Sequence, residues 1–222
     1  MLFAVAAGQN PATLDGVTFA SHPGKILAPV RTIFEALGLS VEFSDGTVRV
    51  SGQALDKNGP TLPDGTRLVP LQELRSWNVE VTWQPEDERA VLSYKGKAIY
   101  VRPGPKRVVI DKSRQELRAM QGSLLVMKTN VSTGRRGKAT PNGSFQAGPY
   151  KARMHRSSLY DDAPMPYSVQ IVGDIFVHGY SSVPGYPASH GCIRMPIDGT
   201  ARFFFEWVDV GTPVEITGRW RA

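Results

Sequence analysis

Two stretches in the first half of the chain repeat one pattern of apolar residues, and this repeat limits the folds that this half can adopt. They cover residues 25–50 and 66–92, and each contains a short apolar stretch, a proline, a brief helical segment and two strands joined by a polar turn. Pro29 corresponds to Pro70, a spacing of 41 residues, at a position where proline can open a helix. The repeat predicts an internal duplication of strand-helix-strand units.

Alternation of apolar residues predicts that the strands of both units are half buried. Val41 and Phe43 in the first unit correspond to Val81 and Trp83 in the second. The Pro-Gly-Pro sequence at residues 103–105 is a hinge signal, and the chain of 222 residues is long enough for two domains. We therefore expect an α+β domain over residues 1–102 and a second domain over residues 103–222.

The sequence pattern of the second half predicts a domain that is mainly β with minor α. Residues 107–112 and 115–120 alternate as two strands joined by a tight turn, and "GSLLVMKTNVSTG" reads as a third strand. Only "DGTARFFFEWVDVG" has a helical period, with Ala201, Phe204, Phe205 and Val208 at its apolar positions. We expect this helix to pack on the core of the domain.

Charge and hydropathy exclude several classes of protein. The net charge is +6 and the pI about 9.5, which favours polyanionic partners. No basic block is longer than the pair Arg135-Arg136, so a dedicated nucleic-acid function is not predicted. No apolar run is long enough to span a membrane. The opening "MLFAVAAGQNPA" is either the tail of a truncated signal peptide or a first strand.

The chain has a single cysteine, Cys192, in a turn rich in Gly, Pro and Ser between His178 and Arg194. A single cysteine excludes an internal disulfide and a Cys-rich metal site. Three hypotheses remain for the thiol, namely a buried small residue, a metal ligand beside His178 and His190, and a nucleophile. The spacing of these residues matches no zinc pattern, so neither a metal nor a cofactor is expected.

A nucleophile is favoured if the strand ending at His178 and the turn at Cys192 meet at one edge of a sheet. The imidazole would then reach the sulfur, withdraw its proton and stabilise the thiolate. Gly191 permits close approach of a carbonyl group, and backbone N–H groups at Gly191 and Cys192 would form an oxyanion hole. The cation of Arg194 can hold a carboxylate.

The sequence "SHGCIRM" with an upstream "VHG" resembles the signature of the L,D-transpeptidase catalytic domain, the YkuD-like family. "STGRRGKATPNGSF" and the terminal "VGTPVEI" resemble further segments of that family, and the resemblance covers about residues 103–216. It implies a β-sandwich-like fold of mixed sheets with a cleft at one rim. The loop from His178 to Ser189, with ten intervening residues, is shorter than is usual in the family.

The resemblance implies roles for individual residues. Cys192 corresponds to the nucleophile and His178 to the general base and acid, with the carbonyl of Gly179 orienting the imidazole. His190 corresponds to a second motif histidine that shapes the turn and the oxyanion region. The candidate substrate contacts are Arg194, Ser189, Tyr167 and Tyr160.

Residues 25–50 resemble the copper amine oxidase N-terminal-like domains of exported bacterial wall proteins, although the second copy has Asn78 in place of Gly38. No copper is expected, because His22 is the only histidine in this half. The half is predicted to dock or space the enzyme on the wall. An extracytoplasmic location and peptidoglycan stem peptides as partners follow from the two resemblances.

Two other classes compete with an L,D-transpeptidase that carbapenems acylate. An NlpC-type cysteine peptidase also uses Cys and His, but its cysteine precedes its histidine in sequence, whereas His178 comes before Cys192 here. A wall-binding protein without activity would be expected to lose Cys192 or His178, and both are present. The acyl acceptor, whether a second stem, water or a protein amine, is left open.

Overall fold

The structure is a computed structural model of the chain and describes residues 11–221. Residues 1–10, which contain most of the apolar opening segment, lie outside the described part. The chain divides into two compact units, with the main division between Gly104 and Pro105. Unit 1 also includes Gln121–Leu124, and unit 2 includes Phe19–Pro23, an exchange of short segments that a single boundary at residue 102 did not predict.

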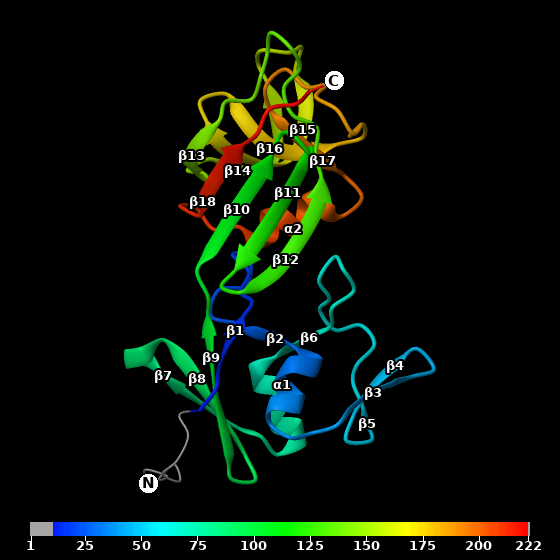
Figure 1. Ribbon diagram of the computed structural model, residues 1–222, viewed down its shortest axis with the longest axis vertical. Coiled ribbons are helices and arrows are strands. Elements are labelled where there is room, and N and C mark those ends of the chain that lie inside the picture. The colour runs from blue at the N-terminus through cyan, green and yellow to red at the C-terminus, as the bar shows by residue number, and fades with distance from the viewer. Residues whose placement is uncertain (1–10, 222) are drawn as a thin grey trace. The chain divides into compact units, whose positions relative to one another are not determined.

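Unit 1 is built from short strands and two short helices (Figure 1). Its elements are β1 (Thr13–Gly16), β2 (Leu27–Pro29), α1 (Val30–Ala36), β3 (Val41–Ser44), β4 (Thr47–Val50), β5 (Gln53–Ala54), β6 (Leu68–Pro70), the 3-10 helix η1 (Leu71–Trp77), β7 (Glu80–Gln84), the 3-10 turn η2 (Pro85–Asp87), β8 (Arg89–Tyr94) and β9 (Lys97–Pro103). They form sheets in the orders β1-β9-β8-β7, β2-β6 and β3-β4-β5.

The two repeats have the same order of elements. Strand β2, helix α1 and strands β3 and β4 in the first correspond to β6, η1, β7 and β8 in the second, and β2 pairs with β6 antiparallel. Pro29 and Pro70 end the two strands and stand at the N-caps of the two helices. Gly38 and Asn78 both follow the helices with positive φ, +83° and +59°, a conformation that asparagine tolerates better than most residues.

The core of unit 1 lies between the two helices and the neighbouring strands. Its large buried side chains include Ile33, Phe34, Leu37, Leu71, Leu74, Leu92 and Val101. The prediction that Phe43 and Trp83 are half buried is wrong, because their exposed fractions are 70% and 49%. Strands β3 and β7 form, but β3 belongs to a small three-stranded sheet and β7 lies at the edge of its sheet, so both rings lack cover.

Unit 2 is mainly β, as predicted. Its elements are β10 (Lys106–Asp111), β11 (Glu116–Gln121), β12 (Leu124–Asn130), β13 (Gly143–Gln146), β14 (Lys151–Ser157), β15 (Ala163–Val172), β16 (Ile175–Tyr180), β17 (Ile193–Pro196), α2 (Thr200–Trp207) and β18 (Pro213–Thr217). One sheet has the order β12-β11-β10-β18-β13 and the other β14-β15-β16-β17. Both sheets are mixed, because β10 pairs with β18 and β16 with β17 in parallel.

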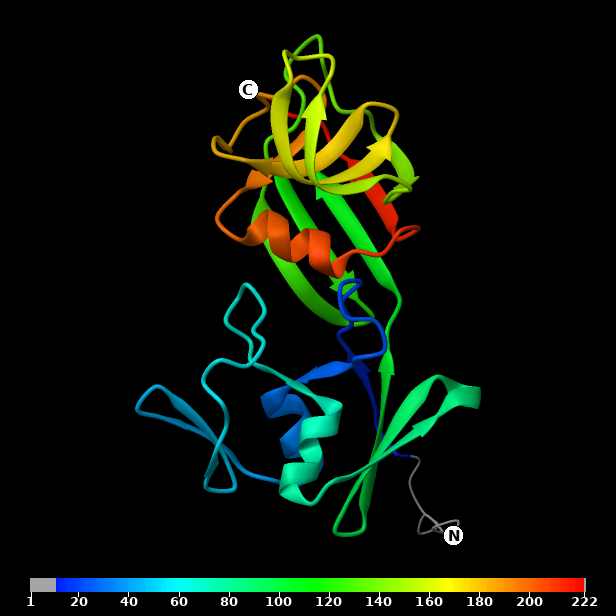
Figure 2. The ribbon, with the colours of Figure 1, turned by 180° about the vertical axis from the view of Figure 1, so that it is seen from behind.

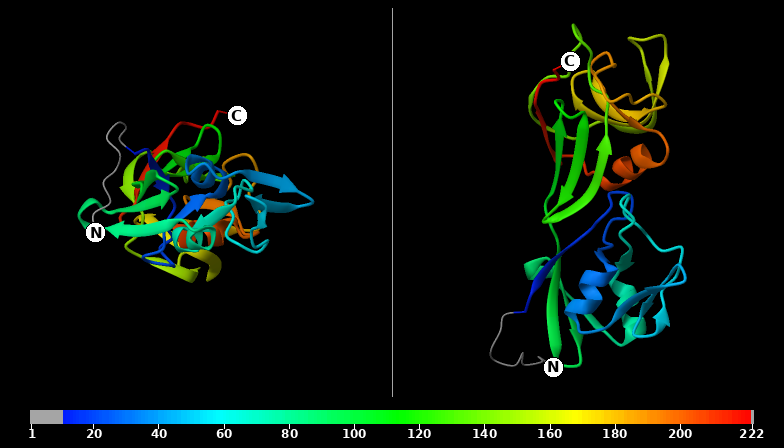
Figure 3. Two further views of the ribbon diagram at one scale, coloured as in Figure 1. Left: turned by 90° about the horizontal axis from the view of Figure 1, so that it is seen from below. Right: turned by 45° about the vertical axis from the view of Figure 1, so that its right-hand side comes forward.

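The two sheets of unit 2 form separate layers. The green strands β10–β12 make one layer, and the yellow strands of the second sheet, together with the orange helix α2, lie on one side of it (Figures 2 and 3). Helix α2 contacts β15, β16 and β17 and buries Ala201, Phe204 and Trp207. Phe205, predicted in the core, is only partly buried. None of the helices within residues 11–221 reaches the length and hydrophobicity of a membrane span.

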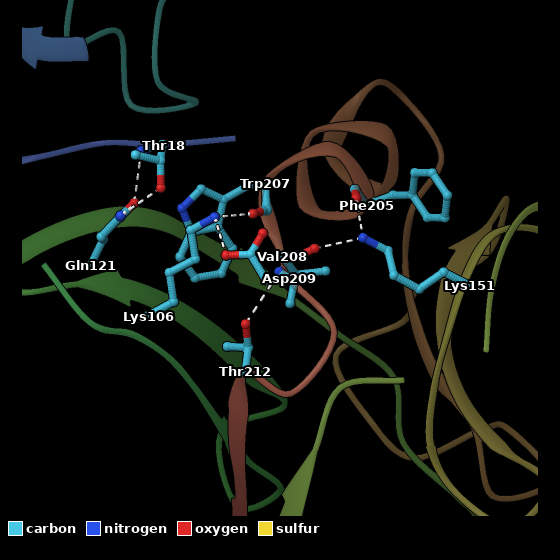
Figure 4. Close-up of polar contacts among 9 residues, drawn as sticks. All are labelled: Thr18, Lys106, Gln121, Lys151, Phe205, Trp207, Val208, Asp209 and Thr212. Carbon is cyan, nitrogen blue, oxygen red and sulfur yellow. Dashed lines mark hydrogen bonds and ion pairs between the residues drawn. The ribbon is translucent and has the colours of Figure 1, made fainter. Parts of the chain in front are cut away.

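Two partly buried lysines close the C-terminal end of α2 (Figure 4). The Nζ of Lys106 donates to the carbonyl of Trp207 at 2.6 Å and pairs with Asp209 at 2.9 Å, while the Nζ of Lys151 donates to the carbonyl of Phe205 at 2.9 Å. The last carbonyl groups of a helix have no partner within it and carry partial negative charge. The lysines supply these partners and so fix the end of the helix against β10 and β14.

Candidate active site

Two neighbouring parallel strands bring His178 and Cys192 together. His178 lies on β16 and pairs with Arg194 on β17, and Cys192 comes directly before β17. Residues two apart along a strand share a face, so Cys192, Arg194 and His178 are expected on the same face of the sheet. The convergence predicted from the sequence is therefore present in the pairing of the strands.

His178 is buried and its ring orientation is fixed. Its Nδ1 lies 2.9 Å from the carbonyl oxygen of Gly179, which requires the proton on Nδ1 and leaves Nε2 as the acceptor of a neutral imidazole. Burial lowers the pKa of His178 to about 4, a shift that the Gly179 hydrogen bond opposes and the charge of Arg194 reinforces. His178 is consequently an unprotonated base at neutral pH.

The thiol of Cys192 is partly buried and also held in its neutral form. Burial raises the pKa of the Cys192 thiol, against the opposing effects of a hydrogen bond from the Phe176 backbone and the charge of Arg194. Sγ donates to the carbonyl of Asp174 at 3.6 Å, and across residues 11–221 no hydrogen bond joins Sγ to His178. A rotation of the thiol away from Asp174 is needed before the imidazole can take its proton.

The turn before Cys192 is held by the side chain of Ser189. Its Oγ accepts from the N–H of Gly191 at 3.1 Å and donates to the carbonyl of Cys192 at 2.6 Å. Ser189 is 1% exposed, so its prediction as a substrate contact is replaced by a role inside the turn. The N–H of Gly191, predicted to face an oxyanion, would have to exchange this hydrogen bond to do so.

The "STGRRGKATP" segment supports the same turn from the other side. Thr140 Oγ1 accepts from the N–H of Gly134 at 2.9 Å and donates to the carbonyl of Gly191 at 2.6 Å. A Cβ on Gly134 would collide with the carbonyl of Lys138 and stand 2.6 Å from the N of Thr140, so only glycine fits there. Gly191 itself has φ +128°, a region that favours glycine.

Ser132 in the same segment anchors the loop that leads from β16 to the turn before Cys192. Its Oγ donates to the carbonyl of Tyr186 at 2.8 Å and accepts from the N–H of Ala188 at 3.1 Å. Its backbone bridges to Arg194 on β17. These bonds explain the polar residues of the motif as a scaffold for the turn.

His190 differs from His178 in its surroundings. It is exposed, its Nε2 lies 2.8 Å from the guanidinium of Arg135, and its ring lies 4.7 Å from that of Tyr160. Neither of these contacts points to a base for the thiol. Tyr160 is thus close to the turn, and its contact with substrate stays a prediction.

The remaining predicted contacts lie in different places. The guanidinium of Arg194 stacks over the ring of Tyr180 at 4.0 Å and has no ion pair with any described residue, so its charge is available to a substrate carboxylate. Tyr167, with φ +54°, faces Phe205 of α2 with ring centroids 6.0 Å apart. Tyr167 lies on β15, next to the strand of His178, and its contact with substrate stays a prediction.

An aromatic cluster beside the thiol was missed by the sequence analysis. The ring of His155 stacks on Phe176 at 4.9 Å, and the hydroxyl of Tyr150 lies 3.2 Å from Nδ1 of His155. Phe176 is two residues before His178 on β16. His155 belongs to β14, and only the pairing of β14, β15 and β16 brings it near. Within residues 11–221, no group of three or more His, Cys, Asp or Glu is arranged to hold a metal ion.

Comparison with known proteins identifies the fold of unit 2. The model of the L,D-transpeptidase catalytic domain, YkuD, matches residues 105–216. No curated protein matches the sequence.

Solved structures of L,D-transpeptidases are similar to this chain. That from Xylanimonas cellulosilytica is 31% identical, with 52% of this chain and 61% of that chain covered and a TM-score of 0.46. That from Stackebrandtia nassauensis is 25% identical, with 52% and 57% covered and a TM-score of 0.48. An L,D-transpeptidase in complex with imipenem is 18% identical, with 97% and 98% covered and a TM-score of 0.47. The chain thus spans about three fifths of the first two.

The matched segment includes the whole arrangement described above, from β10 through the scaffold segment and the two strands that carry His178 and Cys192 to β18. It covers 112 of the 222 residues, just over half of the sequence. The chain belongs to the family of L,D-transpeptidase catalytic domains.

Proposed function

We propose that the protein is a cysteine-dependent L,D-transpeptidase that acts on peptidoglycan stem peptides through an acyl-enzyme on Cys192. One observation carries the proposal. The buried imidazole of His178 lies on β16, and its hydrogen bond to Gly179 leaves Nε2 without a proton. The neighbouring strand, β17, directly follows Cys192, the only cysteine of the sequence. This supplies a nucleophile and a base on one face of a sheet.

The first half of the reaction forms a thioester. The proton of the Cys192 thiol moves to Nε2 of His178, and the sulfur attacks the carbonyl carbon of the third residue of a stem. The backbone N–H of Cys192 is our choice for the oxyanion donor, because the N–H of Gly191 already bonds Ser189. His178 then gives the proton to the amine of the terminal D-Ala as its bond to the carbonyl breaks.

The second half transfers the acyl group. A side-chain amine of another stem attacks the thioester, His178 accepts a proton from it, and the thiol of Cys192 is released. The product is a cross-link between the third residues of two stems. Water as acceptor would instead give L,D-carboxypeptidase activity, with release of D-Ala in both cases. We expect Arg194, whose guanidinium stacks on Tyr180, to hold a carboxylate of the donor stem.

The competing classes fit the structure less well. In NlpC-type peptidases the cysteine normally opens a helix, whereas Cys192 lies in a turn directly before strand β17. A wall-binding protein without activity would not need a buried histidine whose Nε2 is kept free to accept a proton, as in His178. A wall-binding protein without activity predicts no covalent adduct of the kind tested below.

Unit 1 is proposed to dock or space the enzyme on the cell wall, in an extracytoplasmic location, in keeping with its resemblance to copper amine oxidase N-terminal-like stalks. Phe43 and Trp83 occupy corresponding positions of the two repeats and are both exposed. Such rings offer flat faces on which sugar rings can stack. This is the feature of unit 1 that we expect to contact wall polymer.

Replacement of Cys192 by Ala should remove covalent chemistry and leave the fold intact, because the change deletes one sulfur from a partly buried site. Intact mass spectrometry after incubation with imipenem should show an adduct on the wild-type chain and none on Cys192→Ala. Release of D-Ala from a tetrapeptide stem should be lost in parallel. Turnover by Cys192→Ala above a tenth of the wild-type rate would disprove the nucleophile assignment.

Replacement of His178 by Ala should slow alkylation of Cys192 near neutral pH by about 10²–10⁴-fold, the usual contribution of a positioned base. His190→Ala is the matched control and should slow it by less than about tenfold, since His190 is exposed and contacts Arg135 rather than the thiol. Circular dichroism checks the fold of both variants. A larger effect of His190→Ala would reverse the assignment of the base.

The pH dependence of Cys192 acylation follows from the two shifted pKa values. The base form of His178 exists above its pKa of about 4, and the thiol stays neutral beyond its ordinary value of 9.0. The second-order rate constant for imipenem should therefore fall as the pH drops towards 4 and change little between about pH 5 and pH 8. A bend near 6.5 would show instead that His178 titrates as an exposed histidine.

Removal of both exposed rings of unit 1 should weaken attachment to the wall. We expect co-sedimentation of the Phe43→Ser/Trp83→Ser chain with purified sacculi to fall several-fold relative to wild type. Val210→Ser, which removes an exposed apolar side chain of unit 2, is the control. Equal sedimentation of the double variant and the control would rule out docking through these rings.

A further inference from the structure

A pocket lies in unit 2 beside the "STGRRGKATP" segment, residues 132–141. Its volume is about 620 Å³, within the range of ligand-binding sites. Its wall includes the basic residues Lys112, Arg135, Arg136 and Arg219 and the rings of Tyr186 and Trp220. Neither Cys192 nor His178 lines it, so it is separate from the site of the chemical step.

The positive charges of this pocket have no counter-ions. No Asp or Glu is among the residues that line it. Within residues 11–221, Arg136 and Arg219 have neither an ion pair nor a side-chain hydrogen bond, while Arg135 donates to the neutral ring of His190 and Lys112 to the carbonyl of Thr140 at 2.6 Å. The carboxylate of the preceding residue, Asp111, already contacts Ser113 and Arg114.

Four like charges around one concavity repel one another and concentrate a positive potential inside it. Such an arrangement costs stability unless an anion enters. Guanidinium groups suit an oxyanion in particular, because each can donate two parallel hydrogen bonds to a carboxylate or a phosphate. The rings of Tyr186 and Trp220 add faces that can pack against a sugar or an apolar segment.

Hydrogen bonds connect the wall of the pocket to the turn before Cys192. Gly134 and Thr140 belong to its wall, and Thr140 Oγ1 donates to the carbonyl of Gly191 next to Cys192. Tyr186, whose carbonyl is held by Ser132, belongs to the loop that precedes the turn. A ligand in the pocket would thus lie against residues that position the nucleophile.

We propose that this pocket is a second binding site, which takes an oxyanion group of a cell-wall polymer on Arg136 and Arg219 while Cys192 reacts with a stem peptide. The wall as the source of the ligand rests on the proposed function, whereas binding of an oxyanion rests on the pocket alone. The oxyanion has two sources, the carboxylates of peptidoglycan stems and the phosphodiesters of anionic wall polymers.

The test measures binding by calorimetry at low salt in the full chain carrying Cys192→Ala, so that no probe is consumed. The probes are a disaccharide-tetrapeptide, which carries carboxylates, and an oligomer of glycerol phosphate, which carries phosphodiesters. Arg136→Gln/Arg219→Gln should weaken binding of at least one probe about tenfold or more, given the strength of charge-assisted hydrogen bonds. Weaker binding of the oligomer alone assigns the phosphate source, and weaker binding of the peptide alone the carboxylate source.

The matched control is Arg107→Gln/Arg153→Gln, which removes the same charge from exposed, unpaired arginines on β10 and β14. It should weaken binding no more than about twofold if long-range attraction is minor. Arg136→Lys/Arg219→Lys keeps the charge but loses the planar guanidinium, so its affinity should lie between those of the wild type and the glutamine pair. This variant serves as the test if the glutamine pair does not fold. Equal binding by the control pair and both pocket pairs would overturn the proposal.

The outcome is independent of the assignment of the nucleophile. Failure of imipenem to modify the wild-type chain would remove the proposed transpeptidase activity but leave the calorimetric result standing. Retained modification with no effect of the pocket variants would remove the second site and leave the activity in place.

Discussion

The buried hydroxyl of Thr140 is the interaction on which the candidate site depends. It accepts from the N–H of Gly134 and donates to the carbonyl of Gly191, so one side chain joins the two segments of the chain that carry the family signature. Leaving a buried donor or acceptor without its partner costs about 1–3 kcal/mol. Ser189 and Ser132 use their hydroxyls in the same way, and together they fix the turn that presents Cys192.

Burial then decides the protonation state in which the pair rests. It disfavours the charged forms of both groups, lowering the pKa of His178 and raising that of the Cys192 thiol. The resting pair is therefore a neutral thiol and a neutral imidazole rather than an ion pair. In the proposed reaction, charge would develop only when the thiol leaves Asp174 and gives up its proton, and the positive charge of Arg194 would then stabilise the thiolate.

Local sequence patterns predicted the elements well and their surroundings poorly. The repeat, the strands of the second half and the helix over residues 200–207 follow from periodicity, and the turn at Cys192 from its glycine and serine. Burial of Phe43 and Trp83 was mispredicted because alternation does not tell whether another layer covers a strand. The contact of His155 with Phe176 and the lysines at the end of α2 depend on segments far apart in sequence, so no local pattern reports them.

The cations of the chain differ in whether they have a carboxylate partner. Some cations of unit 2 meet carboxylates, as in the pairs of Lys106 with Asp209 and Lys128 with Glu116. Others do not, and among these Arg194, Arg136 and Arg219 have no ion pairs within residues 11–221. Unpaired like charges lower the stability of the free protein. An anionic polymer would relieve this repulsion on binding, and this is the physical basis of the oxyanion site proposed for Arg136 and Arg219.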